Sequence, residues 1–353
     1  MPGVTDVVEQ LFNGLTVGMV YVLLAAGLSI IFGVMDVINF SHGELFALGA
    51  YFALSISSPL GGAGFWVALV VAPLLVGAIG LVIERTTIRP LYGRDPLYHI
   101  LLTFGLVLII QDVIVLGWGR QQQRLDVPAY LNQPIDVFGI QLSAYSYFMI
   151  VVGTALAVGT WLLLNRTKYG MIVRAGSQDR GMVRNVGIDI DRYYTLVFGF
   201  GAALAAIAGI ILGGYLNVNP NMGGNVIIPA FIIVVLGGLG SFRGAVFGGL
   251  LVGVVQTMLR TYVPVLEGLI VFLLMIGVLL AKPQGLFGRD TGEHGGEEGE
   301  LYVGGHGGVL ARSTRIKLGV GAVALLAVAP PILLALTGNS FYVSLLNEML
   351  IWA

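Results

Sequence analysis

The chain consists mainly of long apolar runs separated by short polar breaks. Runs of this kind occupy residues 11–34, 43–58, 64–83, 100–118, 142–164, 193–215, 227–240, 244–260 and 265–281. A helix needs around 20 apolar residues to cross a bilayer core about 30 Å thick, and most of these runs approach that length. The pattern therefore predicts an all-α integral membrane protein, a polytopic bundle of about 8–10 transmembrane helices rather than a barrel of alternating strands.

Two of the runs, 43–58 and 227–240, are short for a full span. A run of this length also suits a re-entrant or broken helix that is buried in protein. That alternative changes the number of spans and leaves the class of protein unchanged.

Composition agrees with a membrane protein. Hydrophobic residues make up 57% of the chain and charged residues 10%, and the mean hydropathy is +0.91. An ordinary soluble domain has roughly 25% charged residues, so that class is excluded. The net charge of −1 gives no electrostatic case for a nucleic-acid partner. The absence of cysteine excludes disulfides and thiolate metal sites.

Glycine is abundant, with 52 residues. Several glycines are spaced four apart, among them Gly14 with Gly18 and Gly249 with Gly253. This small-xxx-small spacing lets helix backbones approach closely in a membrane, so we expect these glycines at helix contacts.

Basic residues are unevenly distributed. None precedes Arg85, whereas six of the eighteen lie in one polar stretch, residues 165–192, called the basic segment below. By the positive-inside tendency the basic segment is expected in the cytoplasm. Alternation then places the loop 84–99 in the cytoplasm, and the base-free loop 216–226 and the N-terminus outside. The sequence thus predicts a multi-pass protein of the plasma or inner membrane.

Composition changes near the end of the chain. Residues 289–315 are rich in Gly and Glu and are expected to form a flexible cytoplasmic linker, because they cannot bury a core. Residues 316–353 hold a further apolar run interrupted by Pro330 and Pro331. They are expected to add a transmembrane segment and the start of a second membrane unit, so the first unit spans 1–288.

A polar break, 33–44, separates the first two apolar runs. Ser41 and Glu44 have the spacing of a capping box, in which a hydroxyl and a carboxylate bind free backbone N–H groups at a helix start. Asn39 and His42 have two interpretations. They begin the helix, or they line a polar path, because polar side chains at membrane depth usually face the bundle interior.

The chain lacks the motifs of a nucleotide-hydrolysing or hydrolytic enzyme. It has no Gly-Lys dipeptide and therefore no GxxxxGK[ST] phosphate-binding loop. The glycine-rich run 237–244 lacks GxGxxG spacing, so it predicts a tight turn between helices. Asp112 is a single acid within an apolar run, whereas proton-driven transporters usually have several intramembrane ionisable groups. No catalytic, cofactor-binding or metal-ligating residue is predicted.

Several motifs follow one another along residues 14–288. They are Gly14-Leu15-Thr16-Val17-Gly18, Asn39-Phe40-Ser41-His42-Gly43-Glu44, Thr167-Lys168-Tyr169-Gly170-Met171, Arg174-Ala175, Asp179-Arg180, Pro220-Asn221-Met222-Gly223 and Pro283-Gln284-Gly285-Leu286-Phe287-Gly288. Together these motifs resemble the branched-chain amino acid ABC transporter permeases of the LivH type. The tail from Phe341 to Glu348 resembles the opening of the sister permease, the LivM type, so a fused or truncated pair is expected.

The resemblance implies an ABC importer permease fold and a transmembrane permease subunit for branched-chain or related small amino acids. The implied partners are two ABC ATPase subunits that bind ATP and Mg²⁺, a second permease that is LivM-like or fused, an extracytoplasmic substrate-binding protein and membrane lipid. No cofactor is expected on this chain. Transport of urea or short amides remains an alternative, and a stand-alone secondary transporter or channel is a further one.

The basic segment is the predicted contact with the ATPase, because a chain that cannot bind ATP must receive work through a surface contact. The predicted residues are Gly170, Arg174, Ala175, Asp179, Arg180, Arg184 and Gly187. A zwitterion that crosses the bundle needs polar partners, and the candidates for this path are Asn39, His42, Gln111 and Asn217.

Overall fold

The computed structural model describes residues 4–137 and 140–288, and these are mostly helical. The helices are α1 (Val4–Met35), α2 (His42–Ser57), α3 (Gly64–Ile83), α4 (Pro96–Trp118), α5 (Ala144–Arg166), α6 (Lys168–Gln178), α7 (Arg180–Asn185), α8 (Ile190–Tyr215), α9 (Met222–Gly237), α10 (Phe242–Tyr262) and α11 (Glu267–Ala281). Short 3₁₀ or π turns occupy Ser58–Ala63, Glu84–Ile88, Arg89–Leu91, Ala129–Leu131 and Pro264–Leu266. The predicted linker 289–315 and further segment 316–353 lie outside the described residues.

The nine predicted apolar runs are all helices in the structure. Within the described residues, seven helices are long and apolar enough to cross a membrane, which confirms a polytopic helical membrane protein. Of the helices formed by the nine runs, α2 and α9, with 16 residues each, are not among the seven; they are formed by the runs 43–58 and 227–240. Helix α11 has 15 residues and reaches the length of a span together with the preceding turn Pro264–Leu266. The sequence therefore singled out the two helices that differ from full spans.

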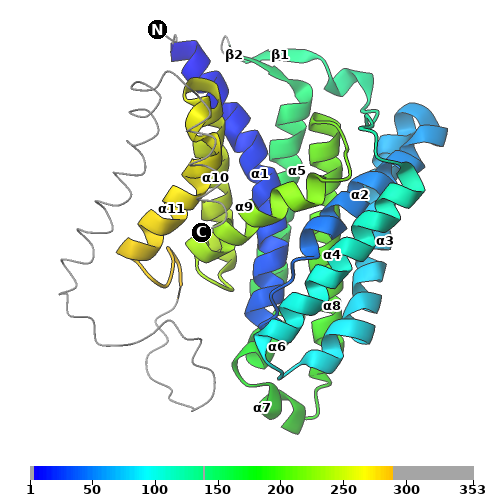
Figure 1. Cartoon of the computed structure of the whole chain (residues 1–353), viewed down its shortest axis with the longest axis vertical. Coiled ribbons are helices and arrows are strands. Elements are labelled where there is room, and N and C mark those ends of the chain that lie inside the picture. The colour runs from blue at the N-terminus through cyan, green and yellow to red at the C-terminus, as the bar shows by residue number, and fades with distance from the viewer. Residues whose placement is uncertain (1–3, 138–139, 289–353) are drawn as a thin grey trace.

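The connection between α4 and α5 contains a small hairpin. Strand β1 (Pro134–Val137) pairs antiparallel with β2 (Ile140–Ser143), and Ile135 lies opposite Leu142. Figure 1 shows this hairpin at one end of the bundle and α6 and α7 at the opposite end. The β-hairpin and the two helices α6 and α7 thus lie at opposite ends of the bundle.

The helices form two sets of four with equivalent pairing. The first set is α1 to α4 and the second is α8 to α11: α1 packs against α10, while α8 packs against α3, and α2 contacts α9. In Figure 1, α1 runs from the hairpin end toward α6, whereas α8 starts beside α7 and runs the other way. The two sets therefore have inverted directions, an arrangement that occurs in many membrane transporters.

Small residues bring α1 and α10 into close contact. A Cβ at Gly14 would lie 2.7 Å from the Cα of Val254, and a Cβ at Gly253 would clash with the Cα of Gly18. Both glycine pairs of the predicted small-xxx-small pattern lie at this helix contact, so the prediction is confirmed. Close backbone approach matters here because lipid supplies no hydrophobic drive for helices to associate.

The turn between α9 and α10 is tight, as the glycine-rich run predicted. Gly238 and Gly240 have φ angles of +100° and +74°, which glycine adopts without the steric cost that a Cβ brings. Ser241 then begins α10, and its Oγ accepts a hydrogen bond from the N–H of Gly244 at 3.1 Å. The glycines of the run thus allow the backbone to turn tightly between α9 and α10.

Candidate functional site

The break between α1 and α2 carries a buried polar cluster. Asn39, Ser41 and His42 have no exposed surface. The Ser41 hydroxyl donates to Oδ1 of Asn39 at 2.6 Å, and Nε2 of His42 donates to the carbonyl oxygen of Leu24 at 3.2 Å. The predicted capping box is wrong: the Ser41 hydroxyl is engaged by Asn39, and no side chain caps the start of α2.

Helices α2 and α9 begin next to one another in the bundle interior. A Cβ at Gly43 would clash with the carbonyl oxygen of Gly223, and a Cβ at Gly223 would lie 2.7 Å from Oε1 of Glu44. Glu44 is itself 1% exposed. The carboxyl group of Glu44 therefore lies buried where the two helix starts meet.

Three polar atoms of this interior region have no hydrogen-bond partner in the described part of the chain. They are Nδ2 of Asn39, Nδ1 of His42 and Oε2 of Glu44. Buried polar atoms without a partner are uncommon in folded proteins, so these atoms are available to water or to a polar ligand. Asn39 and His42 thus lie together, and the structure adds Glu44 beside them.

The other two path candidates lie elsewhere. Gln111 of α4 donates from Nε2 to Oδ1 of Asn221 at 3.2 Å, at the start of α9. Asn217 is exposed in the loop between α8 and α9. No hydrogen bond among the described residues joins Gln111 or Asn217 to Asn39 or His42.

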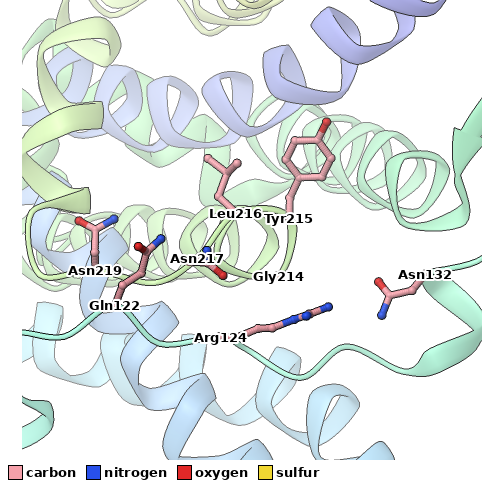
Figure 2. A pocket seen from close by; sticks show the side chains of 8 residues that line it. All are labelled: Gln122, Arg124, Asn132, Gly214, Tyr215, Leu216, Asn217 and Asn219. Carbon is pink, nitrogen blue, oxygen red and sulfur yellow. The ribbon is translucent and has the colours of Figure 1, made fainter.

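Asn217 lines a cavity of about 470 Å³ between the α4–β1 connection and the end of α8, which we call the amide-lined cavity. Its lining residues are Gln122, Arg124, Asn132, Gly214, Tyr215, Leu216, Asn217 and Asn219. Figure 2 shows the Arg124 side chain extended toward Asn132, with Gln122 and Asn219 on its other side. Sequence reasoning missed every lining residue except Asn217, and the only available signal was the polar run 121–124 after α4.

The basic segment folds into α6 and α7. Thr167 begins α6, and its Oγ1 accepts the N–H of Gly170 at 3.1 Å; Asp179 begins α7, and its Oδ1 accepts the N–H of Met182 at 2.8 Å. Gly187 follows α7 with a φ of +86°. A Cβ at Gly170 would clash with the backbone at the end of α5. Gly170, Asp179 and Gly187 therefore shape the segment.

Arg180 is directed into the protein. Its guanidinium carbon lies 4.8 Å from the centre of the Tyr92 ring and 5.2 Å from that of Tyr194, and its Nη2 pairs with Oδ1 of Asp191. Arg184 binds the other carboxylate oxygen of Asp191 at 2.6 Å. The ring quadrupoles and the carboxylate both attract the cation. Helix α7 is thereby joined to the start of α8.

Further contacts extend this connection to the end of α3. Glu84 has no exposed surface and accepts hydrogen bonds from Arg89 at 3.1 Å and from the Tyr92 hydroxyl at 2.8 Å. Arg89 also donates to the carbonyl oxygen of Asp191 at 3.2 Å. Burial, together with the adjacent Glu84 carboxylate, raises the pKa of the Tyr92 hydroxyl, so this group stays protonated and donates. We name Glu84, Arg89, Tyr92, Arg180 and Asp191 the junction cluster.

The basic segment also presents an exposed surface. Its large apolar side chains Tyr169, Met171, Met182 and Val186 are 60–73% exposed. Arg174 is exposed on the same segment, and the Arg184 side chain is 52% exposed. Aromatic residues, Met and Arg are the residue types enriched at protein–protein interfaces. This surface, the exposed face of α6–α7, has the composition of a docking site.

A second cavity, of about 980 Å³, lies between α6 and the central helix α1. Arg174 and Ala175 of α6 line it together with Ser29 and Gly33 of α1. The first two of these belong to the predicted coupling residues. Part of the basic segment thus borders a space that reaches the core of the bundle.

Known proteins resemble this chain over most of its length. Residues 10–279 match the family model described as branched-chain amino acid transport system / permease component. BraD of Pseudomonas aeruginosa, a high-affinity branched-chain amino acid transport system permease protein, is 32% identical over 301 residues, covering 82% of this chain and 98% of that protein. LivH of Escherichia coli K12 is also 32% identical, with 80% and 95% covered.

More distant proteins are also similar. The probable LivH permease of Methanocaldococcus jannaschii is 29% identical, and the alignment covers 76% of this chain and 89% of that protein. Among solved structures, PsaBC from Streptococcus pneumoniae in complex with Fab superposes with a TM-score of 0.40 at 12% identity, covering 74% of this chain and 85% of that one.

The helical bundle and the permease relatives define the class: a multi-pass membrane transport permease, and not an enzyme. Within that class, the chain belongs to the family of branched-chain amino acid transport system permease components. The resemblance to LivH-type permeases that the sequence motifs indicated is confirmed.

Proposed function

We propose that this chain is the membrane-spanning permease subunit of an ATP-driven ABC importer for leucine, isoleucine or valine. The family match and the names of the relatives support the substrate class. The partners in this proposal are two ATPase subunits that bind ATP and Mg²⁺, a second permease subunit and an extracytoplasmic substrate-binding protein. The basic segment faces the cytoplasm, and the N-terminus and the β-hairpin face the outside.

One observation carries the proposal for energy coupling: the basic segment is exposed on one side and fixed to the bundle on the other. Its exposed face offers Met182 and Val186, with Arg174 as a cation, to a soluble partner. Its inner side holds Arg180 against Tyr92, which follows α3, and against Asp191, at the start of α8. A partner that moves this segment therefore moves both helices.

The mechanism follows from this connection. Closure of the ATPase dimer on ATP pushes the α6–α7 segment, and the junction cluster passes the displacement to α3 and α8. Because α3 belongs to one inverted set and α8 to the other, the displacement rocks the two sets against each other. Rigid-body rocking of inverted repeats is an established route to alternating access in transporters.

The interior polar residues have a role on the path in this proposal. Asn39 and His42 lie where the N-termini of α2 and α9 meet, and partly unsatisfied polar groups there offer hydrogen bonds to a zwitterion that passes. Gln111 borders the start of α9, and Asn217 borders the outer end. Asn39, His42 and Gln111 thus lie near the start of α9, and Asn217 lies apart from them in the loop before it.

Reconstituted vesicles test the function. The chain is combined with its partner permease, ATPase subunits and binding protein, and uptake of labelled leucine and of labelled urea is measured with and without ATP. We expect ATP-dependent uptake of leucine. ATP-dependent uptake of urea alone would support the urea or amide permease instead, and equal uptake without ATPase subunits would support a secondary transporter or channel.

A charge reversal tests the contact with the ATPase. Arg174→Glu is expected to reduce both the amount of ATPase that co-purifies and the leucine uptake, because Arg174 is exposed on α6. Arg192→Glu is the matched control, since Arg192 lies in the same segment and is 82% exposed, with a surface partner at Asp189. Normal membrane insertion with undiminished ATPase association and uptake in Arg174→Glu would remove Arg174 from the contact.

A further inference from the structure

The amide-lined cavity is built by two segments that pair as a short antiparallel bridge. The N–H of Gln123 donates to the carbonyl oxygen of Val218 at 2.8 Å, and the N–H of Val218 donates to that of Gln123 at 2.8 Å. This bridge joins the segment after α4 to the loop between α8 and α9. It fixes the register of the residues on either side of each partner.

The register places four polar side chains on one face. Successive side chains along extended backbone point to opposite faces, so residues i−1 and i+1 share the face that residue i does not. Val218 is fully buried, and Gln123 turns its amide to the carbonyl oxygen of Trp118 at 2.7 Å. The neighbours on the other face line the cavity, and they are Gln122, Arg124, Asn217 and Asn219.

The lining has a definite chemical character. Among the lining residues that the structure describes, Arg124 is the only charged one and none is acidic. Arg124 forms no ion pair with any residue that the structure describes. Asn132, Asn217 and Asn219 supply amide groups, and Leu216 adds an apolar side chain. A guanidinium without a partner matches a carboxylate through two parallel hydrogen bonds.

The amides complete the match to a zwitterion. Amide oxygens accept hydrogen bonds and so bind an ammonium group; that of Asn219 already accepts the N–H of Asn221 at 3.1 Å, which leaves those of Gln122, Asn132 and Asn217. No acid, which would repel a carboxylate, is present among the described residues that line the cavity. The volume of about 470 Å³ lies within the range of small-molecule sites, roughly 300–1,000 Å³. Figure 2 shows Arg124 and the amides of Gln122, Asn217 and Asn219 around the same space.

We propose that the amide-lined cavity is a receiving site for a small zwitterionic amino acid, with Arg124 bound to its carboxylate. The proposal rests on the proposed function, because it places the entry point of an imported amino acid at the outer end of the bundle. It goes beyond that function by assigning a substrate-binding role to Arg124, Gln122, Asn132 and Asn219.

Equilibrium binding of labelled leucine to the purified permease–ATPase complex, without the binding protein, tests the site. Arg124→Gln is expected to weaken leucine binding at least tenfold, and Arg120→Gln to leave it unchanged, because Arg120 is exposed four residues earlier and does not line the cavity. Leucinamide, which lacks the carboxylate, should compete at least tenfold more weakly than leucine with the wild-type complex. In the Arg124→Gln complex, leucine and leucinamide should compete equally poorly.

Several results would overturn the proposal. They are equal leucine affinity in Arg124→Gln, Arg120→Gln and the wild type, equal competition by leucinamide and leucine, and no leucine binding to the wild type. Loss of binding-protein association in Arg124→Gln with unchanged leucine binding would assign Arg124 to protein docking instead. Normal ATP-driven uptake by the wild-type complex shows that the proposed function stands in each of these cases, and elution as an intact complex shows that the variants are folded.

Discussion

The guanidinium carbon of Arg180 lies 4.8 Å from the centre of the Tyr92 ring. Tyr92 follows α3 and Arg180 begins α7, so this contact joins two parts of the chain that the sequence separates widely. Asp191 at the start of α8 holds the same guanidinium. Arg180 therefore positions the basic segment on the bundle, while the exposed apolar side chains remain available to a partner. Arg174 is exposed on the same segment, and its Nη1 donates to the carbonyl oxygen of Leu164.

Removal of the Arg180 charge should separate ATP hydrolysis from transport. Arg180→Gln loses contacts with two aromatic rings and a charge-assisted hydrogen bond, together worth about 1–3 kcal/mol. We expect the complex to assemble and hydrolyse ATP, while leucine uptake per ATP hydrolysed falls roughly tenfold, the effect of about 1.4 kcal/mol. Parallel assays of uptake and phosphate release in vesicles measure this ratio.

Arg180→Lys and Arg192→Gln are the controls for that ratio. Lys keeps the charge but lacks the planar group that stacks on Tyr92, so an intermediate ratio is expected. Arg192→Gln removes an exposed ion pair with Asp189 and should change nothing measurable. An Arg180→Gln complex with wild-type uptake per ATP would show that the junction cluster does not transmit the motion.

Glu84 should be important for stability. Glu84→Ala leaves Arg89 and the Tyr92 hydroxyl without their acceptor in a buried position, and loss of one partner of a buried pair is strongly destabilising. Because the Arg89 side chain is 28% exposed and can be partly hydrated, we expect a loss of about 1–3 kcal/mol. Thermal unfolding in detergent measures the change.

The control for Glu84 is Asp189→Ala, which removes an exposed ion pair with Arg192. A change within about 0.5 kcal/mol is expected for that variant. Equal melting temperatures for Glu84→Ala and Asp189→Ala would mean that the buried carboxylate adds nothing to stability.

Local sequence properties predicted the helices well. The length of an apolar run decides whether a helix can cross a bilayer, and this holds whatever the neighbouring helices are. The same reasoning identified 43–58 and 227–240 as unusual, and the structure has the 16-residue helices α2 and α9 there. Glycine spacing likewise predicted the close contact of α1 and α10, because spacing on one helix face is a local property.

The partners of individual side chains, both near and distant in the chain, could not be predicted from the sequence. Ser41 had the spacing of a helix cap, yet its hydroxyl donates to Asn39. The spacing gave no sign that Arg180 would turn inward, since that depends on Tyr92, in the turn before α4, and on Tyr194 in α8. The amide-lined cavity exists only because Gln123 pairs with Val218, and nothing in either loop sequence specifies that partner.

The meeting point of α2 and α9 should tolerate no added methyl group. Gly43→Ala would place a Cβ against the carbonyl oxygen of Gly223, so one helix must shift. Overpacking of this kind costs typically about 1–3 kcal/mol. The control is Gly224→Ala, where the added Cβ meets nothing within 4 Å. A fall in melting temperature that is the same in both variants would refute the close contact.

The orientation of the chain can be tested with single cysteines, because the natural chain has none. Gln121→Cys and Val186→Cys lie in exposed positions at opposite ends of the bundle. A membrane-impermeant maleimide applied to intact cells should label position 121 at once and position 186 only after the membrane is permeabilised. The reverse order would place the basic segment outside, away from cytoplasmic ATP.

The most direct test of the account is a photo-crosslink from the exposed face of α6–α7. A benzophenone maleimide is attached to Met182→Cys in the transport-competent complex, and to Val113→Cys on an exposed, apolar position of α4 as the control. The account predicts an adduct of the permease with the ATPase subunit from position 182 and none from position 113. A complex that imports leucine but gives no ATPase adduct from position 182 would contradict it.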